Sequence, residues 1–221
     1  MNAVLQPEAL PGVRAWTLSL GALVLAGAWA GPLPGYAQGS FSAHMTMHLL
    51  VVAAAAPLLA LGVAGSRWDP AARRPALFAP LPAAAVELVV IWGWHAPLLH
   101  QAARTDAAAL VLEQGSFLVA GLLVWLSAFG GDRRRHPGRA AAGIVGLLVT
   151  SMHMTLLGAL LTLSPRLLYG HDHGGAFGLT ALEDLQLGGV LMLLGGGLAY
   201  LVGGLYLLAE LLRRGGGGRV L

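Results

Sequence analysis

The chain has 221 residues, of which 57% are hydrophobic and only 10% are charged. A soluble domain normally carries about a quarter charged residues, so this chain has too little polar surface to cover a water-facing globule. Several apolar runs reach the roughly 20 residues that a bilayer-spanning helix needs. None shows the alternating pattern of a membrane β-barrel. Composition therefore predicts an all-α, polytopic transmembrane helix bundle that lies in a lipid bilayer.

Six spans are predicted, and glycine and proline mark most of the breaks between them. They cover residues 13–31, 42–64, 76–96, 107–129, 140–163 and 181–211. The pattern predicts one transmembrane domain over residues 1–221, with a flexible tail at 213–221. The first span could also be the apolar core of a signal peptide, with a small-residue cleavage site at Ala28 and Ala30. Only Arg14 precedes the apolar core "LSLGALVLAGAWA", and Glu8 lies upstream as well, so the positive flank is poor and an uncleaved helix is favoured.

The basic residues predict the orientation in the membrane. All 13 are arginines, and they lie between the apolar runs rather than in one stripe, which argues against a nucleic-acid partner. With both termini in the cytoplasm, eleven arginines fall inside and only Arg104 and Arg166 fall outside. Because positive charge is retained on the cytoplasmic side, this split predicts cytoplasmic N- and C-termini. We expect a multi-pass protein of the bacterial inner (cytoplasmic) membrane.

This orientation gathers the ionisable side chains in the outer half of the bundle. Seven of the eight histidines and four carboxylates lie there, among them His44, His48, His95, His100, His153, Glu87, Glu113 and Asp184. Ionisable groups inside a membrane are costly, so they usually mark function and face the bundle interior. The outer half is therefore the predicted location of the site.

The strongest local signal is the pair His44 and His48. Residues four apart share one helix face, so both imidazoles can reach one ion. Met47 falls on the same side, and the segment "SMHMT" places Met152 next to His153 on the fifth span. Thioether and imidazole ligands without thiolate suit copper, Cu(I) in particular, whereas zinc seldom takes methionine.

Plainer interpretations compete with a metal site. A single membrane histidine is more often hydrogen-bonded to a neighbouring helix, and methionines commonly fill gaps in packed cores. Met45 and Met154 are assigned to packing on this ground. His171 and His173 are interpreted as a solvated loop tip, with ion capture at an entrance as the alternative.

Four motifs in order carry a family resemblance: "AHMTMHLLVVAAAAPLLALG", "WGWHAPLLHQAA", "LEQGSF" and "ALEDLQLGGVLM". Over residues 40 to 195 the chain resembles the CtaG family of membrane-integral cytochrome c oxidase assembly factors. The family's H-x-x-x-H matches His44 and His48. Its W-H-x-P matches Trp94, His95 and Pro97. Its acidic position before the last span matches Asp184, followed by Gln186, Gly188 and Gly189.

The chain also departs from the family pattern. Gln114 follows Glu113 where the family often has histidine, Leu185 follows Asp184 where glutamine is common, and His100 stands where tyrosine is common. Relatives often have a seventh span. The resemblance implies help in assembling a copper-containing terminal oxidase, with the oxidase's copper-centre subunit as partner. A homo-oligomer is left open.

The main hypothesis is a copper-binding assembly factor that passes copper to a cytochrome oxidase subunit. The candidate metal ligands are His44, His48, His95, His153, Met47 and Met152. Asp184 and Glu113 are expected to orient the imidazoles as hydrogen-bond acceptors, as carboxylates often do around metal-bound histidine. The alternatives are a haem-binding electron carrier with His48 and His153 as axial ligands, and an ion or proton transporter that uses Glu87, Glu113 and His153. The sequence shows no nucleophile and base at a recognisable spacing, so an enzyme is not expected.

Overall fold

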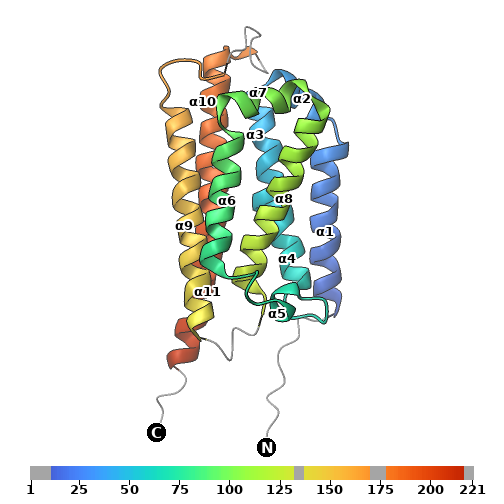
Figure 1. Ribbon diagram of the computed structural model, residues 1–221, viewed down its shortest axis with the longest axis vertical. Helices are drawn as coiled ribbons and strands as arrows, with labels where there is room; N and C mark the ends of the chain where they lie inside the picture. Colours follow the sequence, from blue (N-terminus) through green and yellow to red (C-terminus); the bar gives the residue numbers. More distant parts are fainter. Residues whose placement is uncertain (1–10, 132–136, 170–177, 217–221) are drawn as a thin grey trace, which may run out of the picture.

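The computed structural model describes residues 11–131, 137–169 and 178–216, and every regular element among them is helical. Figure 1 shows the long helices side by side in one bundle. The elements are α1 (Pro11–Ala30), α2 (Leu33–Gly39), α3 (Phe41–Leu49), η1 (Leu50–Ala55), α4 (Ala56–Val63), α5 (Pro70–Arg73), α6 (Pro80–Trp94), α7 (Pro97–Thr105), α8 (Ala107–Phe129), α9 (Pro137–Thr162), α10 (Ala181–Leu191), η3 (Met192–Gly196) and α11 (Gly197–Gly216).

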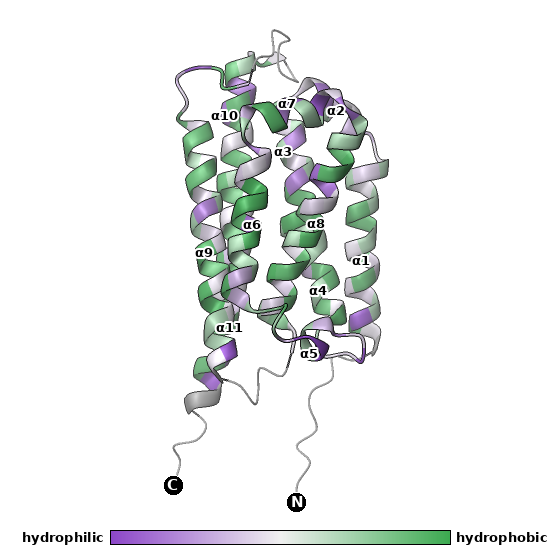
Figure 2. Cartoon of the chain, viewed as in Figure 1, coloured by the Kyte–Doolittle hydropathy of each residue, from purple (hydrophilic) through white to green (hydrophobic). Residues whose placement is uncertain are grey.

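Five helical stretches are long and apolar enough to cross a membrane, and a bent pair makes a sixth. The five are Gly12–Ala30, Phe41–Val63, Ala107–Phe129, Gly138–Thr162 and Ala181–Arg213. This confirms the predicted all-α, polytopic bundle of about six spans. Figure 2 shows hydrophobic residues along most of the bundle, with hydrophilic ones at its ends and on α3 and α8.

The third predicted span differs most from the structure. Its helix α6 begins at Pro80 rather than near residue 76, and after Trp94 the chain bends by 72° into α7. Proline at the start of α7 explains the break, because Pro97 has no backbone N–H and pushes the preceding residue out of the helical region. Ala96 is accordingly extended, with ψ 135°.

Two short helices, α2 and α7, lie across one end of the bundle (Figure 1). We call this the α7 end. Residue His100, expected in a loop, lies on α7 with 1% of its surface exposed. At the opposite end, α11 continues to Gly216 through residues 213–216, which were predicted to begin the flexible tail. Arg213 Nε donates to the Ala209 carbonyl at 3.3 Å, as a continuing helix allows. Residues 217–221 lie outside the described part.

The second span contains a π-helical segment, η1, just before Pro57. A carbonyl released from regular helical bonding inside a membrane needs another donor. The Val52 carbonyl has two, Trp125 Nε1 at 3.0 Å and the Tyr200 hydroxyl at 3.3 Å. The same Tyr200 hydroxyl is within hydrogen-bond distance of the fully buried carboxyl of Glu87, so its single proton is shared between the two acceptors. This polar contact fixes Glu87 in the middle of the bundle.

Glycine permits the close contact of α9 with α10 and η3. A Cβ placed on Gly158 would lie 2.5 Å from the Leu193 nitrogen, and one on Gly189 would lie 2.5 Å from the Thr162 nitrogen. Side chains at these two positions would therefore force the helices apart. The contact holds α10, and with it Asp184, at a fixed height beside α3.

Candidate metal centre

Helix α3 carries His44 and His48, and Asp184 of α10 fixes where it begins. Both carboxylate oxygens of Asp184 accept hydrogen bonds from the first residues of α3, including the Phe41 backbone N–H at 2.6 Å and the Ser42 hydroxyl at 2.5 Å. These bonds satisfy amide groups that have no partner inside a helix, and the negative charge suits a helix N-terminus. Asp184 was expected to accept from an imidazole. The structure instead shows it holding the helix that carries both imidazoles.

His44, His48 and Glu113 of α8 form a compact buried group. Their ligand atoms all lie within 4.8 Å of one another. His44 Nε2 is 3.2 Å from each oxygen of Glu113, and His48 Nε2 is 3.5 Å from Oε1. The exposed fractions of the three residues are 1%, 5% and 0%. Within the described ranges this is the only group of three histidine or acidic residues with such spacing.

Gln114 contacts the imidazole of His48 at Nδ1, the nitrogen that does not face Glu113. Its Nε2 lies 2.8 Å from His48 Nδ1 and 3.3 Å from Glu113 Oε2. Its Oε1 accepts from the indole N–H of Trp29 on α1, at 3.3 Å. The first span is thereby joined to the histidine pair through one glutamine side chain.

His95 and Met45 form a second part of the cluster. His95 Nδ1 donates to the Ile91 carbonyl at 2.7 Å, which leaves Nε2 as the nitrogen with a free lone pair. That nitrogen faces the Met45 sulfur at 3.4 Å. The rings of His95 and His48 are 6.0 Å apart between centroids, so the two parts are neighbours.

His100 closes the cluster at the α7 end. Its ring centroid lies 5.0 Å from that of His44 and 4.2 Å from that of Tyr169. The Tyr169 hydroxyl donates to the His95 carbonyl at 2.9 Å. Burial raises the pKa of Tyr169 to about 12, so this hydroxyl stays protonated and keeps donating at physiological pH.

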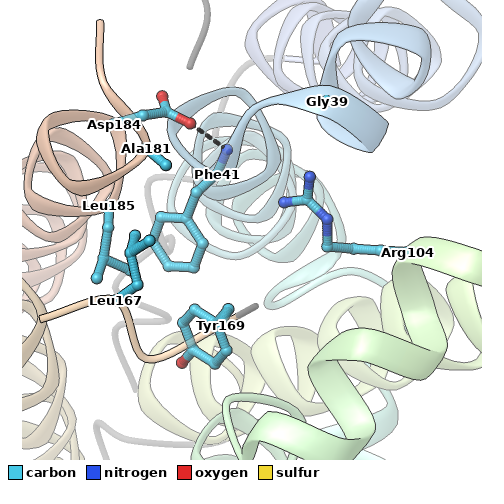
Figure 3. A pocket seen from close by; sticks show the side chains of 8 residues that line it. All are labelled: Gly39, Phe41, Arg104, Leu167, Tyr169, Ala181, Asp184 and Leu185. Carbon is cyan, nitrogen blue, oxygen red and sulfur yellow. Dashed lines mark hydrogen bonds between the residues drawn. The ribbon is translucent and has the colours of Figure 1, made fainter. Parts of the chain in front are cut away.

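A small pocket opens above these rings (Figure 3). Phe41, Tyr169, Arg104 and Asp184 contribute to its wall. In Figure 3 the Arg104 guanidinium points across the pocket toward the start of α3. Phe41 lies 5.3 Å from the His100 ring, centroid to centroid, so the pocket adjoins the histidine cluster. It is a candidate entrance. His171 and His173, the other entrance candidates, lie outside the described residues.

The structure brings only some of the predicted ligands together. His44, His48, His95 and Glu113 lie together in one buried cluster. Met47 is buried and does not join the group; with Trp29 and Gln114 it lines an apolar groove. Met152 is 72% exposed on the bundle surface, since it lies on the opposite side of α9 from the core.

Two further polar residues stay outside the group of three. His153 is buried on α9, and neither of its ring nitrogens has a hydrogen-bond partner. Glu87 is paired with Tyr200 and lies about two helical turns before His95 on α6. The proposed relay of Glu87, Glu113 and His153 is therefore not seen as one connected chain of hydrogen bonds in the described part.

Sequence reasoning missed three residues of this cluster. Met45 was assigned to packing, His100 to a loop, and Gln114 was noted only as a departure from the family pattern. The available signals were the spacing of Met45 and His48, three residues apart on one helix, and the position of Gln114 beside Glu113. No local sequence pattern predicts the contact between His100 and Tyr169.

The donor set fits a metal ion. It offers imidazole nitrogen, carboxylate oxygen and thioether sulfur in a buried space, and His48 Nε2 makes no hydrogen bond within the described part, with Glu113 Oε1 3.5 Å away. Buried polar atoms without partners are rare and need an explanation. A bound ion between these side chains would supply one.

Comparison with known proteins gives the family. The model of the family described as cytochrome c oxidase caa3 assembly factor matches residues 2–214. No curated protein matches, and no solved structure matches. The family match covers nearly the whole chain and agrees with the resemblance seen in its four motifs. The chain belongs to the cytochrome c oxidase caa3 assembly factor family.

Proposed function

We propose that this assembly factor binds copper at the α7 end of the bundle and delivers it to a copper centre of the oxidase. His44, His48 and Glu113 form the primary site, with His95 and Met45 beside it. We place the α7 end on the outer, periplasmic side because of the arginine distribution. The single observation that carries the proposal is the convergence of ligand atoms from α3 and α8 within 4.8 Å, wholly inside the bundle.

The ligand types favour copper over zinc or magnesium. Magnesium prefers an all-oxygen shell, and zinc seldom takes a thioether. Here His95 Nε2 and Met45 Sδ face each other at 3.4 Å, and both atoms carry lone pairs. Such a pair suits Cu(I), whereas the two imidazoles with Glu113 also accept Cu(II). Cu(I) is the expected cargo, entering or leaving through the pocket beside His100.

A copper titration of the purified chain tests the proposal. We expect about one tightly held Cu(I) per chain, measured by competition with a coloured Cu(I) chelator. The double variant His44→Ala/His48→Ala removes two ligands and is expected to lose more than tenfold in affinity. His153→Ala and Met152→Leu are matched controls, because neither residue joins the group of three.

The proposed function also requires a test in cells. In a deletion strain, the wild-type gene is expected to restore oxidase activity, and the double-histidine gene is expected not to restore it at limiting copper. Equal copper affinity of the wild type and the double variant would refute the metal site. Full rescue by the double variant at limiting copper would show that the factor assists the oxidase without carrying copper.

A further inference from the structure

The orientation of the Gln114 amide follows from its neighbours. Trp29 Nε1 can only donate a hydrogen bond, and the Glu113 carboxylate can only accept one. Trp29 faces the amide oxygen at 3.3 Å, and Glu113 faces the amide nitrogen at 3.3 Å. Exchanging the two ends of the amide would oppose donor to donor and acceptor to acceptor. Gln114 therefore presents its NH₂ group to His48.

This orientation determines which nitrogen of His48 carries the proton. Gln114 Nε2 donates to His48 Nδ1 at 2.8 Å, so Nδ1 must offer its lone pair. In a neutral imidazole the proton then lies on Nε2, the nitrogen that faces Glu113. His95 shows the opposite arrangement, because its Nδ1 donates to the Ile91 carbonyl and leaves Nε2 free.

A metal ion among His44, His48 and Glu113 needs the lone pair of His48 Nε2. The remaining proton must then move to Nδ1, which becomes a donor, and the facing amide must present its oxygen. When Gln114 turns its oxygen toward His48, its NH₂ group comes to face the indole N–H of Trp29. Two donors cannot share a hydrogen bond, so the contact between Trp29 and Gln114 breaks.

We propose that Trp29 and Gln114 lock His48 in the tautomer that cannot bind metal, and that metal entry breaks the link from Gln114 to α1. The proposal rests on the proposed copper site. It makes Gln114 and Trp29 positioning residues for copper release: the intact lock weakens copper binding and favours handing the ion on. It also makes α1 the helix that senses whether the centre is loaded, because Trp29 belongs to α1.

The metal-free protein provides the first test, which requires no copper binding. We would record ¹⁵N-detected histidine spectra of the full chain in detergent, and assign His48 by comparison with His48→Gln. We expect a protonated Nε2 and an unprotonated Nδ1. In Gln114→Leu the amide is gone, and the Nδ1-protonated form is expected to become populated. A protonated Nδ1 in the metal-free wild type would overturn the lock, whatever the result for copper.

The second test uses copper affinity. Trp29→Phe keeps an aromatic ring but removes the indole donor, so Gln114 can turn its oxygen toward His48 without opposing its NH₂ group to an indole N–H. Its Cu(I) affinity is expected to rise about threefold to tenfold, the effect of one net hydrogen bond. Trp94→Phe is the matched control, because its indole N–H donates to Ser116 at 2.8 Å instead. Its affinity is expected to be unchanged.

The outcomes separate this proposal from the copper function. An unchanged or weaker affinity in Trp29→Phe, with copper bound by the wild type, would overturn the lock and leave the copper site standing. A wild type that binds no copper would refute the site and, with it, the coupling to α1. The ¹⁵N spectra would then still decide the tautomer of His48. Circular dichroism and gel filtration would verify that both tryptophan variants fold.

Discussion

At the scale of single residues, the two methionines of α3 offer the sharpest test of the proposed copper site. Met45 and Met47 are each 1% exposed and lie two residues apart. Only Met45 places its sulfur beside an imidazole nitrogen. Met47 lines the groove next to Trp29.

We predict that Met45→Leu weakens Cu(I) binding by about tenfold and that Met47→Leu leaves it unchanged. Leucine conserves the volume of methionine, so neither change should cost more than about 1.5 kcal/mol in stability. Chelator competition for Cu(I) would measure the difference. If both variants bind equally well, the sulfur of Met45 takes no part in the site.

The sequence predicted the part of the site that depends on helical spacing. His44 and His48 follow from their four-residue separation, and Glu113 and His95 follow from depth in the membrane. Met47 was chosen by the same spacing rule, but the rule says nothing of which neighbouring helix lies opposite. His95, at the end of α6, lies against Met45 and not Met47, so the packing of the chain determines which methionine meets an imidazole.

At the scale of elements, the start of α3 depends on a carboxylate from another span. Ser40 caps the helix through its hydroxyl, which accepts from the Ala43 backbone N–H at 3.2 Å. Asp184 adds the charged acceptor and is 3% exposed. The connection between α10 and α3 spans more than 140 residues of sequence, as in the bond from Ser40 to Asp184. No local signal in the sequence could predict it.

We predict that Asp184→Ala destabilises the protein by about 1–3 kcal/mol, because it leaves buried donors without an acceptor. The midpoint of thermal unfolding in detergent would measure the loss. Glu183→Gln is the matched control. It belongs to the capping box of α10, and glutamine keeps a capping box intact. A similar midpoint for Asp184→Ala and wild type would show that Asp184 does not stabilise α3.

The bend between α6 and α7 was also beyond the sequence pattern. The apolar run through residue 96 predicted a span that ends there. The pattern could not show that the following segment folds back as a helix and buries His100. Helix α7 is short, and a short amphipathic helix is stabilised mainly by tertiary packing. Its position therefore depends on its contacts with α8.

At the scale of the whole molecule, orientation decides whether the site can serve an oxidase copper centre outside the cytoplasm. The bundle has two distinct ends in Figure 1, with α2 and α7 at one and α5 at the other. Eleven of the 13 arginines are expected at the end opposite α7. The positive-inside rule therefore predicts that the α7 end faces the periplasm.

A cysteine-free chain makes this prediction simple to test. Gln101→Cys places one thiol on the exposed side of α7, and Ala76→Cys places one in the exposed loop at the opposite end. In intact cells, a membrane-impermeant maleimide is expected to label Gln101→Cys but not Ala76→Cys. After the membrane is permeabilised, both should react, which controls for accessibility. Labelling of Ala76→Cys alone in intact cells would invert the bundle, place the histidine cluster toward the cytoplasm, and remove the route to a periplasmic copper centre.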